Sequence, residues 1–213
     1  MSETLDFIHR YRPGTDPRRA PLLLLHGTGG DENDLVPLAE RLAPGAALLS
    51  PRGKVEENGM PRFFRRLAEG VFDIEDLHRR TAELAAFIAT AQKSYGLARP
   101  IALGFSNGAN IAAALLLSHP DVLAGAALLR PMTPFVPADA PDLTGIPILL
   151  LSGSMDPLVQ PGDRDRLAKI FSAAGAELSY EVVPAGHGLS PLDLATTGDW
   201  LQRYGVVRSL TST

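Results

Sequence analysis

Short apolar segments alternate with amphipathic segments along most of the chain. The apolar segments have the length of single strands and carry almost no charge. Strands of a parallel sheet are covered by helices on both faces, so they are apolar throughout rather than alternating. The pattern therefore predicts strands of a mostly parallel sheet at residues 21–27, 46–51, 101–106, 124–129, 146–153 and 178–184.

The segments between these strands place apolar residues three and four positions apart, which is typical of amphipathic helices. We predict helices at residues 31–43, 75–96, 107–120, 163–176 and 190–205. In the second of these, the inward stripe is expected to comprise Leu77, Leu84, Phe87, Ile88 and Ala91. Alternating strands and helices indicate the α/β class, with helices on both faces of the sheet and ligands bound beyond the carboxyl ends of the strands.

Two stretches, residues 51–76 and 130–145, fit neither pattern. Each directly follows a predicted strand and therefore starts at the carboxyl edge of the sheet. Long loops at that edge more often line a site than connect domains. The second stretch is too short for a lid domain, and we predict a single domain over residues 1–213.

Composition excludes several classes of function. The 213 residues carry a net charge of -4 at pH 7, which argues against nucleic acid as a partner because phosphate binding needs a basic surface. Cysteine is missing, which excludes disulfides, thiolate metal sites and a cysteine nucleophile. The chain also lacks an apolar run of membrane-span or signal-peptide length, so we expect no membrane partner and, by default, a cytoplasmic protein.

The sequence "LGFSNGAN" at residues 103–110 places Ser106 between Gly104 and Gly108, after a predicted strand and before a predicted helix. This GxSxG pattern in a strand-turn-helix context is typical of a nucleophile elbow. Glycines beside the serine would let the strand and the helix pack closely around a strained turn. The alternative is that Ser106 only caps the helix.

A nucleophilic serine needs a base, for which histidine is the usual residue. The five histidines are His9, His26, His78, His119 and His187. In strand-turn-helix serine enzymes the chain order is serine, acid, histidine, and only the last two histidines follow Ser106. His187 lies in "PAGHGL" after the last predicted strand, where glycines let a loop bring the ring inward, whereas His119 ends a helix. His187 is the predicted base; the alternative is a loop histidine bonded to the backbone.

Asp156 is the predicted acid, because it lies a few residues beyond the strand at 146–153 and precedes His187. Pro157 keeps it in an extended or turn conformation. Asp163 and Asp165 are rivals but have the position of charges at a helix N-terminus. A structural turn aspartate is the alternative role for Asp156.

Two backbone amides are needed to stabilise an oxyanion, one after the nucleophile and one from a loop after an early strand. Asn107 supplies the first, and Thr28 in "HGTGGDEND" is best placed to supply the second. This glycine-rich loop lacks the GK[ST] ending of a P-loop and the spacing of a dinucleotide motif, which argues against nucleotide binding.

Taken in order, "LLLLHGTGGDENDL", "SPRG", "RFFRRL", "GFSNGANIA", "GSMDPLV" and "PAGHGL" resemble the phospholipase/carboxylesterase family of α/β hydrolases. The resemblance spans about residues 20–203 and is strongest to small bacterial carboxylesterases related to acyl-protein thioesterases and hydroquinone-resistance esterases. It implies an α/β-hydrolase fold without a large lid, a catalytic triad of Ser106, Asp156 and His187, and oxyanion amides at Thr28 and Asn107. Thioesterases of this group usually carry glutamine where this chain has Asn107.

The resemblance implies a serine carboxylesterase that cleaves small to medium acyl or aryl esters through an acyl-enzyme, with no metal and no cofactor. Acyl thioesterase or lysophospholipase activity is one alternative, and a non-catalytic ligand receptor on the same scaffold is another. A small-molecule ester is the expected partner. A homodimer is left open, since Trp200 and Leu201 in the last helix are expected to be core residues.

Substrate contacts are expected from the two long loops. The apolar candidates Phe63, Phe64, Met132 and Phe135 would either wall the site or pack the loops onto the core. Arg65 is a candidate for binding a carboxylate-bearing ester; the alternative is that the arginines of this loop form solvated ion pairs with Glu56 and Glu57.

Overall fold

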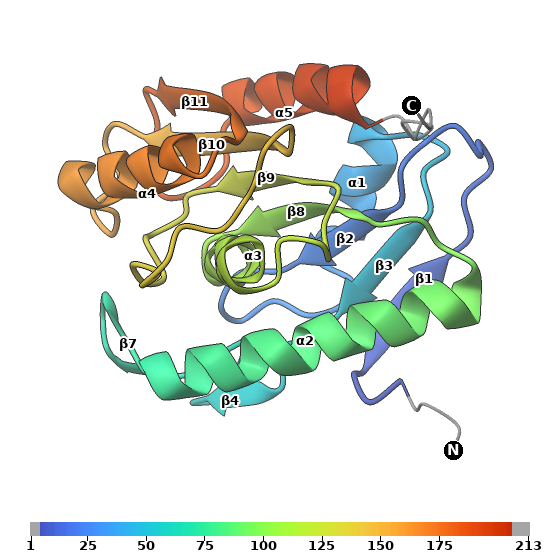
Figure 1. The fold of residues 1–213 in the computed structure, drawn as a ribbon, viewed down its shortest axis with the longest axis horizontal. Helices are drawn as coiled ribbons and strands as arrows, with labels where there is room; N and C mark the ends of the chain where they lie inside the picture. The colour runs from blue at the N-terminus through green and yellow to red at the C-terminus, as the bar shows by residue number, and fades with distance from the viewer. Residues whose placement is uncertain (1–4, 206–213) are drawn as a thin grey trace.

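The structure is a computed structural model that describes residues 5–205 (Figure 1). Its centre is a seven-stranded sheet with the order β1-β3-β2-β8-β9-β10-β11, in which every neighbouring pair is parallel except β1 and β3. The strands are β1 (His9–Arg12), β2 (Leu22–Leu25), β3 (Leu48–Pro51), β8 (Ile101–Phe105), β9 (Gly125–Leu129), β10 (Pro147–Gly153) and β11 (Glu177–Val183). The six parallel strands lie where the apolar runs predict them.

Five helices of the described region flank this sheet: α1 (Val36–Leu42), α2 (Ile74–Tyr95), α3 (Asn107–Ser118), α4 (Pro161–Ala173) and α5 (Pro191–Tyr204). The buried residues of α2, α3 and α4 pack in one hydrophobic cluster, and those of α1 and α5 pack in the other. The helices therefore cover both faces of the sheet (Figure 1), as the alternation of elements predicts.

Strand β2 shows why the parallel strands are apolar throughout. Leu23 and Leu25 belong to the first cluster, Leu22 and Leu24 belong to the second, and all four have 0% exposure. Burying one leucine side chain stabilises a fold by about 1.5–3 kcal/mol. A polar residue at any of these positions would therefore be costly, whichever face it occupied.

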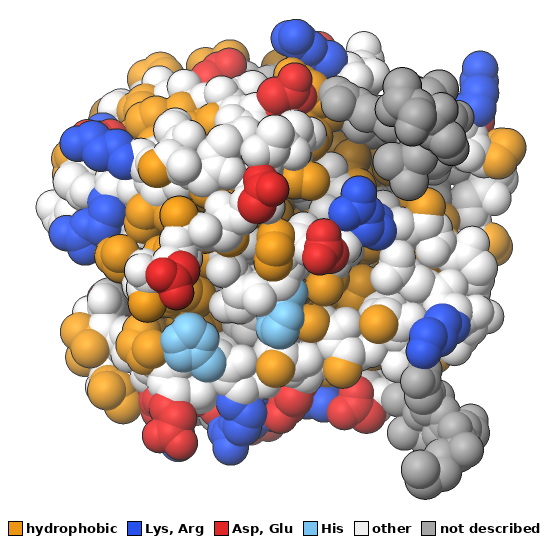
Figure 2. Space-filling model, in the orientation of Figure 1, with side chains coloured by type: hydrophobic (Ala, Val, Ile, Leu, Met, Phe, Trp, Pro, Cys, Tyr) orange, Lys and Arg blue, Asp and Glu red, His pale blue; other side chains and the backbone are white. Residues whose placement is uncertain are grey.

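Helix α2 has the buried stripe that its sequence predicts. The five predicted residues of the stripe are all buried. At the N-terminus Asp73 accepts a hydrogen bond from the backbone N–H of Asp76, and at the C-terminus Gly96 has a φ of 65°, the left-handed conformation that glycine adopts without cost. Acidic and basic side chains gather along the lower edge of Figure 2, where α2 lies in Figure 1. Arg80 and Glu83 of this helix form an ion pair. Trp200 and Leu201 of α5 are buried too, as expected.

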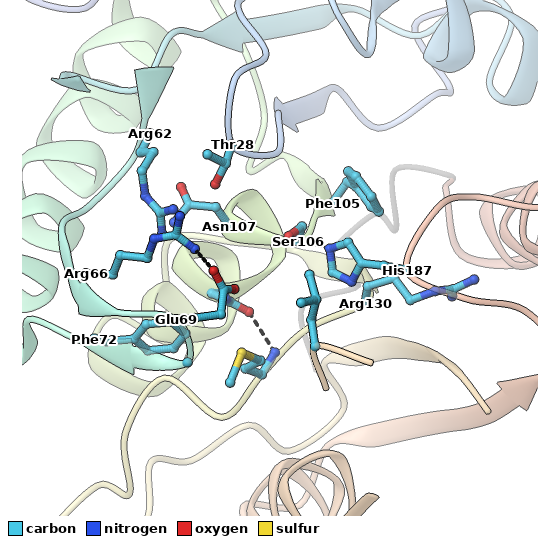
Figure 3. Close-up of a pocket in the computed structure, with 14 residues that line it drawn as sticks. Thr28, Arg62, Arg66, Glu69, Phe72, Phe105, Ser106, Asn107, Arg130 and His187 are labelled. Atoms are coloured by element: carbon cyan, nitrogen blue, oxygen red, sulfur yellow. Dashed lines mark hydrogen bonds and ion pairs between the residues drawn. The ribbon is translucent and has the colours of Figure 1, made fainter. Parts of the chain in front are cut away.

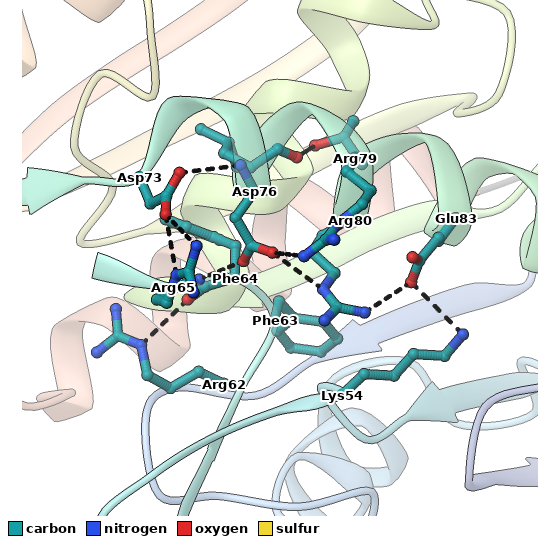
Figure 4. A network of polar contacts seen from close by, with 12 residues as sticks. Lys54, Arg62, Phe63, Phe64, Arg65, Asp73, Asp76, Arg79, Arg80 and Glu83 are labelled. Carbon is teal, nitrogen blue, oxygen red and sulfur yellow. Dashed lines mark hydrogen bonds and ion pairs between the residues drawn. The ribbon is translucent and has the colours of Figure 1, made fainter. Parts of the chain in front are cut away.

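The stretch 51–76 forms two small hairpins at the carboxyl edge of the sheet. They are β4 (Val55–Glu57) with β5 (Met60–Arg62), and β6 (Arg66–Ala68) with β7 (Val71–Phe72). The buried carboxylate of Asp76, in the first turn of α2, holds this stretch in place (Figure 4). It accepts a hydrogen bond of 2.8 Å from the backbone N–H of Arg65 and pairs with Arg79 and Arg80.

The stretch 130–145 has no helix or strand but is tied to the helices below it. Asn110 Oδ1 accepts a hydrogen bond of 2.7 Å from the backbone N–H of Met132. Asp163 Oδ2 accepts one of 2.7 Å from the backbone N–H of Thr133. Both long stretches thus have fixed positions at the same edge of the sheet. Among the described helices, none is long and apolar enough to cross a membrane.

Candidate active site

Ser106 lies in a strained turn between β8 and α3, with a φ of 51° and a ψ of -114°. A Cβ atom at Gly104 would lie 2.7 Å from the carbonyl oxygen of Gly108, and one at Gly108 would lie 2.0 Å from the carbonyl oxygen of Leu25. Both distances are too short for any other residue, so β8, α3 and β2 can approach one another only because the two positions are glycine. The predicted geometry of the GxSxG turn is confirmed.

The structure brings Ser106, His187 and Asp156 together. His187 Nε2 lies 2.9 Å from Ser106 Oγ, and His187 Nδ1 lies 2.8 Å from Asp156 Oδ2. Since a carboxylate can only accept, Nδ1 carries the hydrogen and Nε2 is free to accept the hydroxyl proton of the serine. Asp156 is oriented in turn by the backbone N–H of Leu158, which donates to its Oδ1 at 2.9 Å. The arrangement suits proton transfer from serine to histidine.

The loop that carries His187 is held by a buried ion pair that the sequence analysis missed. Arg130, directly after β9, makes two hydrogen bonds to Asp193, from Nη1 to Oδ1 at 2.8 Å and from Nη2 to Oδ2 at 2.7 Å. Its Nε also donates to the carbonyl oxygen of Gly186 at 2.8 Å. Both charged side chains have 0% exposure. Arg130, which follows β9, thus fixes the position of Gly186, the residue before His187.

Asp193 is kept charged in this buried position. Burial alone would raise its pKa, but hydrogen bonds from Arg130 and from the backbone and side chain of Ser190 outweigh burial and hold the pKa below its ordinary value. Asp193 also completes a capping box with Ser190 at the start of α5. One signal was present in the sequence: an arginine directly after a buried strand, and an aspartate three residues after a helix-capping serine.

The predicted oxyanion amides belong to Thr28 and Asn107, and both residues line a cavity beside Ser106 (Figure 3). Asn107 is the first residue of α3, where a backbone N–H has no acceptor within the helix. The next two amides of the Thr28 loop are used, since Gly29 donates to the carbonyl oxygen of Pro61 and Gly30 to that of Gly27. The side chain of Asn107 accepts a hydrogen bond of 2.8 Å from the backbone N–H of Phe63.

The buried side chain of His26 supports the loop that carries Thr28. Its Nδ1 lies 2.7 Å from the carbonyl oxygen of Gly27, and its Nε2 accepts a hydrogen bond of 3.0 Å from the backbone N–H of Gly53. One nitrogen therefore donates and the other accepts, which requires a neutral ring. Burial lowers the pKa of His26 from its ordinary value and keeps it in that form.

The neutral His26 makes the stability of the protein depend on pH. Because its pKa is higher in the unfolded chain, the unfolded state binds more protons as the pH falls below about 6.5. We expect the free energy of unfolding to decrease between pH 7 and pH 5, and to decrease less in His26→Gln. Urea unfolding of both proteins at the two pH values measures this, and the other histidines cancel in the comparison. Parallel pH dependence in the two proteins would contradict it.

The cavity beside Ser106 has a volume of about 280 Å³ and is lined by both long stretches, as expected for loops at this edge. Of the five residues predicted to contact substrate, Met132 lines the cavity, whereas Phe63, Phe64, Arg65 and Phe135 do not. The residues of the cavity wall that the sequence analysis did not assign to the site include Arg62, Arg66, Glu69, Phe72, Phe105 and Leu158.

The four residues that do not line the cavity have other partners. Phe63 and Phe64 are buried in the hydrophobic cluster over α2 and α3, with exposures of 2% and 0%. Phe135 packs against the ring of His78, with 4.5 Å between the ring centroids. Arg65 points to solvent and pairs with Asp73 at 2.6 Å. The three phenylalanines pack the loops onto the core, which was the alternative for the aromatic side chains. Arg65 forms a solvated ion pair, as the alternative for the arginines had it, but with Asp73 and not with Glu56 or Glu57.

Metal ligands are not grouped anywhere in the described part of the chain: between residues 5 and 205 no three His, Asp or Glu side chains form a cluster that could hold a metal ion. The polar groups of the cavity are instead the serine and histidine pair, the amides beside them and the arginines of the hairpins.

The chain is similar to hydrolases of known sequence or structure. Residues 20–145 match the model of a family described as the alpha/beta hydrolase fold. The Bacillus subtilis (strain 168) protein "Putative hydrolase MhqD" is 45% identical over 194 residues, covering 90% of this chain and 96% of that protein. The Bacillus cereus carboxylesterase structure is 42% identical, with a TM-score of 0.91 over 93% of this chain and 95% of that one. A Mesorhizobium loti carboxylesterase structure is 38% identical, with a TM-score of 0.83 over 88% and 90% of the two chains.

Proposed function

The chain belongs to the α/β hydrolase family, and from that premise we propose that it is a serine carboxylesterase acting on small to medium acyl or aryl esters through an acyl-enzyme. One observation carries the proposal. The hydroxyl of Ser106 lies 2.9 Å from a histidine nitrogen whose other nitrogen lies 2.8 Å from the buried carboxylate of Asp156. This is the geometry that makes a serine nucleophilic at neutral pH.

The first step forms the acyl-enzyme. Ser106 Oγ attacks the carbonyl carbon of the ester while His187 Nε2 takes the hydroxyl proton. Asp156 stabilises the charged imidazole that results, without itself becoming protonated. The negative charge on the carbonyl oxygen is met by the backbone N–H groups of Thr28 and Asn107, each worth about 3 kcal/mol in comparable sites. His187 then gives its proton to the leaving alcohol, and the C–O bond of the ester breaks.

The second step releases the acid. A water molecule attacks the acyl-serine while His187 Nε2 accepts its proton, and the same two amides stabilise the second oxyanion. His187 then returns the proton to Ser106 Oγ. The hydrogen bond from Arg130 to the carbonyl oxygen of Gly186 contributes to both steps. The imidazole of His187 must stay aligned with Ser106 while the charge of the imidazole changes.

The size of the cavity supports small substrates. Its volume of about 280 Å³ is just below the range of roughly 300–1,000 Å³ that is usual for small-molecule sites. The stretch 130–145 is too short for a lid domain, and the backbone N–H groups of Met132 and Thr133 hold it in place by hydrogen bonds to Asn110 and Asp163. A long acyl chain would therefore extend out of the cavity into solvent, and little of its apolar surface would be buried.

An assay of wild-type protein on three substrate classes tests the proposal. We expect short 4-nitrophenyl esters to be turned over with a burst of 4-nitrophenol equal to the enzyme concentration, and with kcat/KM at least about tenfold above that for acyl-CoA or lysolipid. Preference for acyl-CoA would favour a thioesterase, and preference for lysolipid a lysophospholipase. Binding without turnover of any of the three would point to a receptor.

A further inference from the structure

Arg62 is a buried cation that faces the cavity beside Ser106 (Figure 3). Its side chain is 4% exposed. Its Nε donates to the carbonyl oxygen of Phe64 at 3.2 Å and lies 3.4 Å from Glu57 Oε2. Neither Nη1 nor Nη2 makes a hydrogen bond to any of residues 5–205. Both terminal nitrogens of the Arg62 guanidinium can therefore donate hydrogen bonds to a ligand in the cavity.

The neighbouring cation, Arg66, is better satisfied. It contacts Glu57 Oε1 at 2.7 Å and also pairs with Glu69, whose side chain is 64% exposed. The guanidinium groups of Arg62 and Arg66 lie side by side in Figure 3. Two arginines thus share one half-buried carboxylate, that of Glu57, while the second carboxylate lies in solvent and reaches only Arg66.

A guanidinium in this position favours binding of an anion in the cavity. Arginine keeps its charge in proteins, and Nη1 and Nη2 of Arg62 can donate to an acceptor in the cavity that this residue lines. Burial, and then the charge of Arg66, lower the pKa of Arg62, and the charges of Glu57 and Glu69 offset this only in part. The planar fork of Nη1 and Nη2 fits the two oxygens of a carboxylate. Arg130, the other arginine in the cavity wall, cannot do this because Asp193 already fills its fork.

We infer that Arg62, with Arg66 beside it, binds a carboxylate of the substrate, so that the substrates are esters carrying a free carboxylate on their acyl or alcohol side. The inference rests on the proposed esterase function and names its substrate class. The sequence analysis assigned this role to Arg65, which points away from the cavity to Asp73. The carboxylate takes no part in bond cleavage; it orients the ester carbonyl toward Ser106.

Matched esters test the inference. Mono-4-nitrophenyl glutarate and 4-nitrophenyl pentanoate differ in the acyl carboxylate, and 4-carboxyphenyl butyrate and phenyl butyrate differ in the carboxylate on the alcohol. For at least one pair we expect kcat/KM of the wild type to favour the acidic ester by about 10- to 100-fold, as expected for a charge-assisted hydrogen bond. Ratios near one for both pairs would overturn the inference.

Three variants assign the preference to residues. Arg62→Gln is expected to reduce the ratio at least about tenfold, by raising KM for the acidic ester. The matched control is Arg65→Ala, an arginine three positions away whose removal should leave the ratio unchanged. Glu69→Gln removes a solvent-exposed carboxylate that competes for Arg66, and it should increase the ratio. If Arg62→Gln does not fold, Glu69→Gln decides: a ratio that stays the same or falls contradicts the inference.

Ser106→Ala separates this test from that of the proposed function. Turnover of all four esters that survives in Ser106→Ala would overturn the proposed function. Turnover that depends on Ser106 but shows no preference for acidic esters would overturn the inference alone. A preference that is lost equally in Arg65→Ala would show that the loop as a whole, rather than Arg62, selects the substrate.

Discussion

Ser106→Ala is expected to lower kcat for ester hydrolysis by about 10⁵- to 10⁶-fold, the size of loss that follows removal of the nucleophile in serine hydrolases. The physical reason is that Ser106 Oγ, 2.9 Å from His187 Nε2, is the atom from which the proposed base takes a proton. Alanine has the same Cβ atom as serine, so the strained turn keeps its packing and the variant should fold. Steady-state kinetics on a short 4-nitrophenyl ester measure the effect.

Ser118→Ala is the matched control for this variant. Ser118 is the last residue of α3 and is exposed at the end opposite to Ser106. Its kcat should equal that of the wild type. Activity of Ser106→Ala within tenfold of the wild type, in a preparation free of contaminating esterase, would contradict the proposed mechanism. Within residues 5–205, Ser106 Oγ is the side-chain group at hydrogen-bond distance from His187 Nε2.

Arg130→Met is expected to lower the free energy of unfolding by about 3–5 kcal/mol, since it leaves the carboxylate of Asp193 buried without its partner. Activity should fall as well, because the carbonyl oxygen of Gly186 loses its donor and the His187 loop is no longer fixed. Urea unfolding gives the first quantity, and kcat of the folded fraction gives the second.

Two further variants test this interpretation. Arg65→Met removes an arginine that is 62% exposed and paired with Asp73, and a surface pair of this kind should cost less than about 1 kcal/mol. The double variant with Arg130→Met and Asp193→Leu removes both buried charges and should recover part of the lost stability, but not the activity, because the Gly186 contact is still missing. Recovery of full activity in the double variant would show that Arg130 does not position His187.

The parallel strands and the central residues of the site could be predicted because each obeys a local rule. A strand such as β2 is buried on both faces, so its apolar run needs no knowledge of its neighbours. The elbow at Ser106 needs glycine at two fixed positions. Chain order and flanking residues then single out Asp156 and His187 among several candidates of the same type. The structure places His187 beside Ser106, and Asp156 beside His187.

Other features depend on distant partners, and a local pattern does not reveal which residues will meet in the fold. Strand β1 is half exposed and polar, and it exists because β3 offers an unpaired edge. Arg130 and Asp193 are 63 residues apart and become a pair only when the sheet is assembled. The direction of a loop side chain is equally hidden. Arg62 and Arg65 are alike in sequence, but one faces the cavity and the other faces solvent.

The most direct test of the arrangement of Ser106, His187 and Asp156 is covalent labelling with a fluorophosphonate, followed by mass spectrometry of the peptides. We predict one adduct per chain, on Ser106, formed much more slowly in His187→Ala and not at all in Ser106→Ala. No adduct on the wild type, or an adduct that persists when Ser106 is replaced, would contradict the account.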